Sequence, residues 1–168
     1  MKKQRLYHFL FSFILVTLGV LLDQYTKHLA VQRLKDNAPF VLIKNVFQLE
    51  YLENRGAAFG ILQGQQILFI LCVLLITLFS FYFFIKVSLN RRFIPLRLCM
   101  ILILAGAFGN CIDRIRLNYV VDFFYFKLIN FPIFNVADIY VTVAAGLLII
   151  LLIFYYKEDD LANLFRRS

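Results

Sequence analysis

Four long apolar stretches divide the chain, and this pattern is its main structural signal. None of them contains Asp, Glu, Lys or Arg, and they cover 6–22, 67–85, 98–112 and 139–156. A transmembrane helix needs about 20 mostly apolar residues, so each stretch can cross a bilayer once a few flanking residues are added. We therefore expect transmembrane spans at about 6–24, 67–86, 97–114 and 136–156.

The first apolar stretch begins like a secretory signal peptide, because Lys2, Lys3 and Arg5 precede it. No small-x-small cleavage pattern follows, and the chain continues with Asp23 and Lys27, which indicates an uncleaved membrane helix. Asp23 and Lys27 are four residues apart with the acid first, the favourable order for an ion pair on one helix face. One interpretation of the two residues is a simple salt bridge at the helix end.

The segment 28–66 has a different character, with charged residues between short apolar runs. The runs 40–43 and 46–52 alternate and are rich in β-branched and aromatic residues, which predicts short strands. A glycine-rich segment, 54–64, follows and marks a turn or a close backbone approach. It is either a plain loop into the next helix or a loop that closes over a substrate, with Asn54 as a polar contact.

Composition supports a membrane protein with one domain covering residues 1–168. Hydrophobic residues make up 62% of the chain and the mean hydropathy is +0.78, whereas roughly half of an ordinary soluble domain is apolar. The cysteines, Cys72, Cys99 and Cys111, lie in or beside apolar stretches and form no CxxC pair. We expect core thiols rather than disulfides or a zinc site.

The distribution of basic residues predicts the orientation. A net charge of +8 is compatible with nucleic-acid binding, but the basic residues cluster between apolar stretches, which membrane topology explains better. With four spans, both termini lie on one side. Because loops rich in Lys and Arg face the cytoplasm, we expect cytoplasmic termini and extracytoplasmic segments at about 25–66 and 115–135. The cytoplasmic side then carries Lys2, Lys3, Arg5, Lys86, Arg91, Arg92, Arg97, Lys157, Arg166 and Arg167.

This orientation brings polar residues from distant positions to one membrane surface. Charge at the edge of an apolar segment is costly, so it indicates a functional site. The residues concerned are Asp23, Asn54, Asn110, Arg114, Asp122 and Asp138. A transporter or channel subunit that relays ions, and a structural protein whose polar residues only cap helices, are the alternatives to a reaction at this surface. An ion path places its acids near mid-span, which favours the surface reaction.

Two of these acids also have purely structural explanations. Asn135 can cap the last helix, and Asp138 at the third helical position would complete a capping box. Asp122 can pair with Arg114 or Arg116. Neither explanation requires any chemistry.

The functional hypothesis joins Asp122 and Asp138 as a pair. Two carboxyl groups in one site cannot both ionise, so one keeps a proton while the other acts as a base. Such a pair can activate water for attack on an amide and protonate the leaving nitrogen. A helix N-terminus favours ionised Asp138, and aromatic neighbours favour protonated Asp122. The residues that would orient the carboxyl groups or substrate carbonyls are Asn54, Asn110, Arg114 and Asn135.

Other hydrolytic chemistries lack their sequence patterns. The chain has no HExxH motif and only two histidines, His8 and His28, which argues against a zinc peptidase. It has no GxSxG motif and no phosphate-binding glycine pattern.

Five short motifs occur in order between about residues 6 and 156. They are Asp23-Gln24-x-Thr26-Lys27, Asn54-Arg55-Gly56-Ala57-Ala58-Phe59-Gly60, Gly109-Asn110-x-x-Asp113-Arg114, Val120-Val121-Asp122-Phe123 and Phe131-Pro132-x-Phe134-Asn135-x-Ala137-Asp138. With them the sequence resembles the lipoprotein signal peptidases, the type II signal peptidases of bacteria.

The resemblance implies an aspartyl endopeptidase of the bacterial inner membrane that removes signal peptides from diacylglyceryl-modified prolipoproteins. Cleavage would fall just before the lipidated cysteine, with water activated between the catalytic Asp122 and Asp138. The implied fold is four transmembrane helices, a small extracytoplasmic β-sheet platform and a short outer helix. The family's supporting and substrate-contact positions fall on Asp23, Lys27, Asn54, Gly56, Asn110, Asp113, Arg114, Asn135 and Ala137.

The resemblance also implies inhibition by the cyclic peptide globomycin and no metal or organic cofactor. The expected partners are lipidated prolipoproteins and membrane lipid, with no nucleic acid. We expect the protein to be a monomer.

Overall fold

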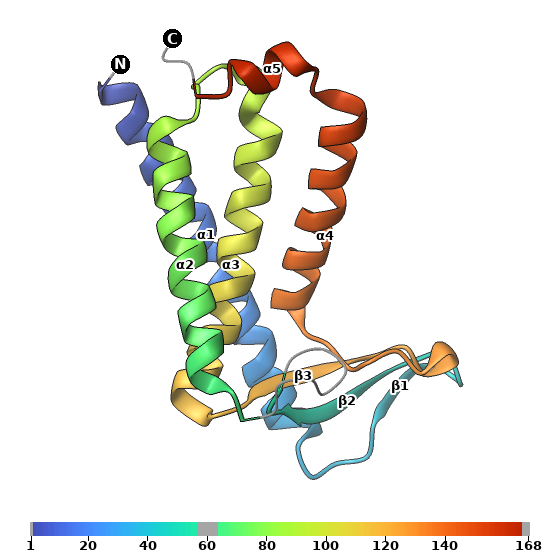
Figure 1. Ribbon diagram of the computed structural model, residues 1–168. Helices are drawn as coiled ribbons and strands as arrows, with labels where there is room; N and C mark the ends of the chain where they lie inside the picture. The colour runs from blue at the N-terminus through green and yellow to red at the C-terminus, as the bar shows by residue number, and fades with distance from the viewer. Residues whose placement is uncertain (1, 57–63, 166–168) are drawn as a thin grey trace.

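Four long helices stand together as a bundle, with a small sheet at one end (Figure 1). The structure is a computed structural model that describes residues 2–56 and 64–165. Each helix belongs to a segment long and apolar enough to cross a bilayer. The helices are α1 (Lys2–Leu34), α2 (Gln66–Lys86), α3 (Ile94–Leu117) and α4 (Val136–Ile150). The expected four-helix membrane fold is confirmed.

Helix α1 runs well past the end expected for the first span. The sequence pattern groups 28–34 with the outer segment, but these residues form the last turns of α1. Ala30 and Leu34 pack there against Val121 and Phe123 in a small core separate from the main one. Because this apolar stripe is buried against the sheet, the chain stays helical beyond the length that a bilayer needs.

The sheet has three antiparallel strands in the order β1-β2-β3. Strands β1 (Phe40–Ile43) and β2 (Phe47–Asn54) match the two alternating runs, and β3 (Val120–Tyr125) comes from the aromatic stretch after α3. Leu52 faces Asp122 across the β2–β3 ladder, and Asn54 faces Val120. This register brings the end of β2 beside Asp122, although 68 residues separate Asn54 from it.

The segments at the sheet end of the bundle contain little helix in the part of the chain that the structure describes. Within 35–56 and 118–135, the helical element is one 3-10 turn, η3 (Lys127–Ile129). Most of the glycine-rich loop expected at 54–64 lies outside the described residues, which resume at Gly64. Gly64 has a φ of 76°, a left-handed conformation that favours glycine.

The start of α1 and the short helix α5 (Glu158–Ala162) lie at the end of the bundle opposite the sheet (Figure 1). Arg92 in the 3-10 turn η2 (Arg91–Phe93) pairs there with Asp160 at 2.9 Å. Its guanidinium also lies 3.8 Å from the centre of the Tyr155 ring, in the π-helical turn η4 (Leu151–Tyr155) that continues α4. The C-terminal segment therefore ties α4 to the connection between α2 and α3.

Glycines allow α3 to approach α1 and α4 closely near the sheet. A Cβ on Gly106 would lie 2.5 Å from the Ala137 carbonyl oxygen of α4. A Cβ on Gly109 would lie 2.5 Å from the Asp23 carboxylate and 3.2 Å from the Ala137 Cβ. Small residues at helix crossings allow such packing in membranes, as the small-xxx-small pair of Ala105 and Gly109 suggests.

We expect Gly109→Ala to destabilise the protein, because the added methyl group meets a buried carboxylate that cannot move freely. The cost of such overpacking is roughly 1–3 kcal/mol. The matched control is Gly146→Ala, where an added Cβ meets nothing within 4 Å. It should be neutral or slightly stabilising, since alanine favours helix. Thermal unfolding in detergent, followed by circular dichroism, measures both. Equal midpoints for the two variants would contradict the close contact.

Candidate active site

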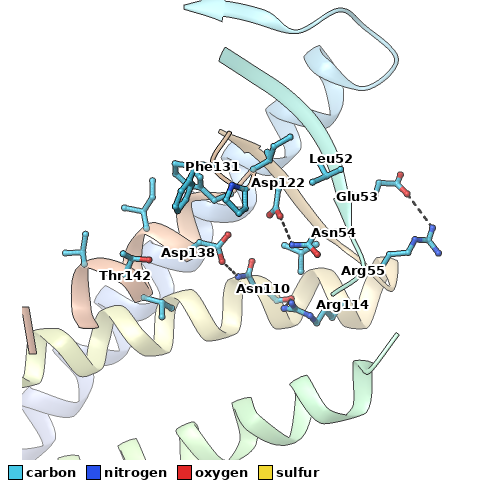
Figure 2. A pocket seen from close by; sticks show the side chains of 17 residues that line it. Leu52, Glu53, Asn54, Arg55, Asn110, Arg114, Asp122, Phe131, Asp138 and Thr142 are labelled. Carbon is cyan, nitrogen blue, oxygen red and sulfur yellow. Dashed lines mark hydrogen bonds and ion pairs between the residues drawn. The ribbon is translucent and has the colours of Figure 1, made fainter. Parts of the chain in front are cut away.

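Asp122 and Asp138 face one pocket at the junction of the bundle and the sheet. The pocket has a volume of about 900 Å³, and Figure 2 shows both carboxylates directed into it, with Asn54 and Asn110 beside them. Asp122 comes from β3 and is 1% exposed. Asp138 comes from the first turn of α4. The two acids that the sequence suggested as a pair therefore share one site.

Asp138 also belongs to a complete capping box. The Asn135 carboxamide oxygen accepts a hydrogen bond from the Asp138 backbone N–H at 3.0 Å, and Asp138 Oδ2 accepts one from the Asn135 backbone N–H at 3.1 Å. The structural explanation of Asp138 is thus confirmed. It does not compete with a chemical role, because Asp138 Oδ1 faces the pocket and accepts a hydrogen bond from Asn110 Nδ2 at 2.8 Å.

Asn135 links the two acids. Because its side-chain oxygen is committed to a backbone N–H, its NH₂ group must point the other way. That group donates to Asp122 Oδ1 at 2.6 Å and to Asn110 Oδ1 at 3.1 Å. Asn135 is fully buried, so its orientation is set by these partners alone.

Asn110 is oriented in the same way by a buried cation. Lys27 Nζ donates to Asn110 Oδ1 at 2.8 Å. An ammonium group can only donate, so the carboxamide oxygen of Asn110 must face Lys27 and its NH₂ group must face Asp138. The predicted proximity of Asn110 to the acids is observed, and Lys27 determines which end of it they meet.

Asn54 completes the set of donors to Asp122. Its Nδ2 donates to Asp122 Oδ2 at 2.8 Å, while its Oδ1 accepts the backbone N–H of Gly56 at 2.9 Å. Arg114 lies nearby, donating to the Gly56 carbonyl at 3.1 Å and stacking over the Phe69 ring at 4.1 Å. Arg114 forms no ion pair with Asp122 among the described residues, so the proposed structural pairing of Asp122 with arginine is wrong.

A buried charged cluster supports the pocket from behind. Lys27 lies 2.9 Å from Asp23 and 3.0 Å from Asp113, so the predicted Asp23–Lys27 pair exists and has a third member. Asp23 accepts the backbone N–H of Ala137 at 2.9 Å, and Asp113 accepts that of Val121 at 3.2 Å. The cluster therefore binds α1 and α3 to the residue before Asp138 and the residue before Asp122.

Gln24 is a member of this cluster that sequence reasoning did not single out. Its Nε2 donates to Asp113 Oδ1 at 2.8 Å and to the Gly109 carbonyl at 3.1 Å. The available signal was its place beside Asp23 at the end of an apolar stretch, within the first of the five motifs.

Burial and a like charge shift the acidity of the pair. Burial away from water, and then the negative charge of Asp138, raise the pKa of Asp122 from its ordinary 3.8 to about 7. The hydrogen bonds from Asn54 and Asn135 oppose this rise, because they favour the ionised form. Below about pH 7, Asp122 therefore keeps its proton. No group of three or more His, Cys, Asp or Glu that could hold a metal ion occurs among the described residues.

Comparison with known proteins assigns the family. The profile described as Signal peptidase (SPase) II matches residues 15–154. The chain belongs to the signal peptidase II family. A "Lipoprotein signal peptidase" of Clostridioides difficile (strain 630) is 44% identical over 137 residues, which cover 80% of this chain and 89% of that protein. One of Streptococcus thermophilus (strain CNRZ 1066) is 43% identical over 135 residues, covering 80% and 86%.

Solved structures agree with this assignment. A bacterial membrane enzyme determined by the in meso method at 2.3 Å resolution superposes with a TM-score of 0.77 and 32% identity, over 94% of this chain and 93% of that chain. Another, at 1.9 Å resolution, gives a TM-score of 0.74 and 33% identity, over 86% and 94%. As a signal peptidase II, the chain is an aspartic peptidase and a bacterial multi-pass membrane protein.

We expect Lys27→Met to destabilise the signal peptidase strongly, because it leaves the buried Asp23 and Asp113 carboxylates without a counter-ion. Breaking a buried ion pair in this way costs roughly 3–5 kcal/mol. The matched control is Lys35→Met, which removes an ion pair to Glu53 between side chains that are 40% and 30% exposed and should have little effect. Thermal unfolding midpoints in detergent compare the two variants. A midpoint of Lys27→Met as high as that of the control would show that the cluster is not what holds the elements together.

Proposed function

We propose that this chain removes signal peptides from diacylglyceryl-modified prolipoproteins, by cleaving the peptide bond just before the lipidated cysteine with water held between Asp122 and Asp138. The observation that carries the proposal is that Asp122 and Asp138 line one pocket, where the carboxamides of Asn54, Asn110 and Asn135 donate hydrogen bonds to them. Family membership supports a signal peptidase, and the names of the relatives supply lipoproteins as the substrate class.

The chemistry follows from the two protonation states. Asp138 accepts hydrogen bonds from the backbone N–H of Asn135 and from the Asn110 carboxamide, and in this mechanism it acts as the base. It takes a proton from the water as the water oxygen attacks the scissile carbonyl carbon. Asp122, which holds the proton, gives it to the carbonyl oxygen.

Collapse of the resulting diol completes the reaction. Asp138 passes its new proton to the amide nitrogen, the carbon–nitrogen bond breaks, and Asp122 takes a proton back from the diol hydroxyl. The site is thereby returned to its starting state with one proton on Asp122. Arg114 and Asn54, which also line the pocket, are placed to contact substrate carbonyl groups.

The shape of the pocket fits a substrate that carries acyl chains. Beyond the acids it continues along α4, where Ile139, Val141 and Val143 line it and are 37%, 40% and 52% exposed. These apolar side chains belong to a membrane-spanning helix, so the pocket is open toward lipid on this side. A diacylglyceryl group could enter from the bilayer while the peptide reaches the acids at the water boundary. The transporter and structural alternatives have no comparable support, since the chain belongs to a peptidase family.

The proposed orientation places this pocket at the extracytoplasmic face and both termini in the cytoplasm. Its support is the excess of basic residues on the side that holds α5 and the start of α1. A tag at either terminus should resist protease added to sealed spheroplasts, and digestion of such a tag would reverse the orientation. We further propose that the protein acts as a monomer, because the same chain supplies both acids and the carboxamides that donate to them. A dimeric mass in detergent by light scattering would contradict this.

We expect Asp122→Asn and Asp138→Asn each to lower cleavage by at least about a thousandfold, because each removes one of the two proton-transferring groups. The assay is the gel shift of a purified diacylglyceryl-modified prolipoprotein in detergent. Asp122→Asn should still fold, because asparagine has the same size and shape, although its NH₂ group then faces one of the two donors, Asn54 or Asn135.

The matched control for both substitutions is Asp36→Asn, an exposed acid on the same side of the bundle, which should cleave at the wild-type rate. Wild-type turnover by either pocket variant would refute the paired mechanism. Loss of activity in the control as well would indicate that surface charge, rather than the pair, is being measured.

We expect kcat to fall as pH rises through about 7, because Asp122 loses the proton that it must donate. Well above that pH the loss should approach about tenfold per pH unit. Asn54→Ala should move the fall to higher pH, since the Asn54 hydrogen bond favours the ionised form of Asp122. The pH dependence of kcat for both proteins measures this. A rate that stays flat above pH 7, or a shift to lower pH in the variant, would show that Asp122 does not hold the proton.

A further inference from the structure

A second pocket lies on the opposite face of β3 from the acids. It has a volume of about 580 Å³, within the usual range for small-molecule sites. Its walls are the last turns of α1, the connection to β1, and the sheet, including Phe123. Successive strand residues point to opposite faces, so the Phe123 side chain faces this pocket while that of Asp122 faces the other.

The lining of this pocket is apolar apart from Thr26 and Arg33. The Thr26 hydroxyl is already used, since it donates to the Asp23 carbonyl at 2.8 Å. Arg33 is exposed, and its guanidinium has no hydrogen bond or ion pair to any described residue. The pocket thus combines an apolar cavity with one unpaired cation at its edge.

The length of α1 is compatible with Arg33 at the level of lipid headgroups. Arg5 lies at the opposite end of the bundle, because it donates to the carbonyl of Ile85 in the last turn of α2 and to that of Val87 just after the helix. At 1.5 Å per residue along α1, Arg33 is roughly 42 Å from Arg5. That separation equals the thickness of a bilayer with its headgroups, about 40–45 Å.

The pocket is also continuous with the lipid-facing surface of α1. Leu21, Leu22 and Tyr25 point outward from this helix and are 59%, 52% and 60% exposed. Leu29, one turn after Tyr25, is 36% exposed and also lines the pocket. An acyl chain that lies along α1 in the bilayer can therefore pass into the pocket without crossing water.

We propose that this pocket binds one anionic phospholipid of the outer leaflet, with an acyl chain between α1 and the sheet and the phosphate on Arg33. A guanidinium binds phosphate through paired hydrogen bonds, which fits the free side chain. The bound lipid would fill the cavity behind β3 and so support the strand that carries Asp122. This site does not depend on the proposed peptidase mechanism, because the lipid contacts neither acid.

The experiment is native mass spectrometry of the full-length protein in detergent with added phosphatidylglycerol, and with diacylglycerol of the same chains as the phosphate-free probe. Wild type should retain one phosphatidylglycerol and bind diacylglycerol about tenfold more weakly. Arg33→Gln should weaken phosphatidylglycerol binding to the diacylglycerol level. Ala38→Trp, which fills the pocket from an exposed position, should lose both lipids.

The matched control is Lys44→Gln, which removes an exposed cation of the same side that does not line the pocket, and it should bind as wild type. Thermal unfolding in lipid-free detergent verifies that each variant is folded. If Arg33→Gln does not fold, Ala38→Trp still tests the site. Undiminished phosphatidylglycerol on both pocket variants, or equal loss in the control, would overturn the site. Displacement of the lipid by lipidated prolipoprotein would assign the pocket to substrate and also overturn it. No step of this test measures cleavage.

Discussion

One buried ammonium group, that of Lys27, is the interaction on which the arrangement of the pocket depends. It contacts the carboxylates of Asp23 and Asp113 at 2.9 and 3.0 Å and the carboxamide oxygen of Asn110 at 2.8 Å. Each carboxylate also accepts a backbone N–H, Asp23 from the start of α4 and Asp113 from β3. Charges that are removed from water must be matched by partners, and a network in which every member is matched admits few alternative geometries. Helices α1, α3 and α4 and strand β3 are thereby joined at one point, directly behind the two pocket acids.

The same logic explains why three carboxamides surround those acids. The oxygens of Asn54, Asn110 and Asn135 each accept from a backbone N–H or an ammonium, groups that cannot accept in return. Their NH₂ groups are therefore turned toward Asp122 and Asp138. The donors stabilise negative charge in the pocket, but burial and the mutual repulsion of the acids oppose a second charge. The balance of these effects raises the pKa of Asp122 to about 7.

Much of this could be predicted from the sequence, because the signals were local. Apolar stretches predicted the helices, alternation predicted β1 and β2, and the spacing of Asn135 and Asp138 predicted the capping box. From the sequence, helix capping and catalysis were rival explanations. In the structure Asn135 takes part in both, because its side-chain oxygen caps the helix while its side-chain NH₂ group donates to a pocket acid. The length of α1 could not be predicted, since residues 28–34 are helical because they pack on β3, far along the chain. The role of Lys27 in orienting Asn110 could not be predicted either, because it depends on how α1 and α3 cross.

The position of β3 shows how one strand can serve a reaction at a lipid boundary. Its Asp122 side faces a pocket that is polar near the acids and apolar along α4, which suits the proposed lipidated substrate. Its Phe123 side faces α1 and the second cavity, beside the unpaired Arg33. A strand of six residues is anchored in place by contacts on both faces, and a void behind it would weaken those on one side. A lipid in that cavity, as proposed, would restore those contacts and so stabilise the position of the strand that carries Asp122.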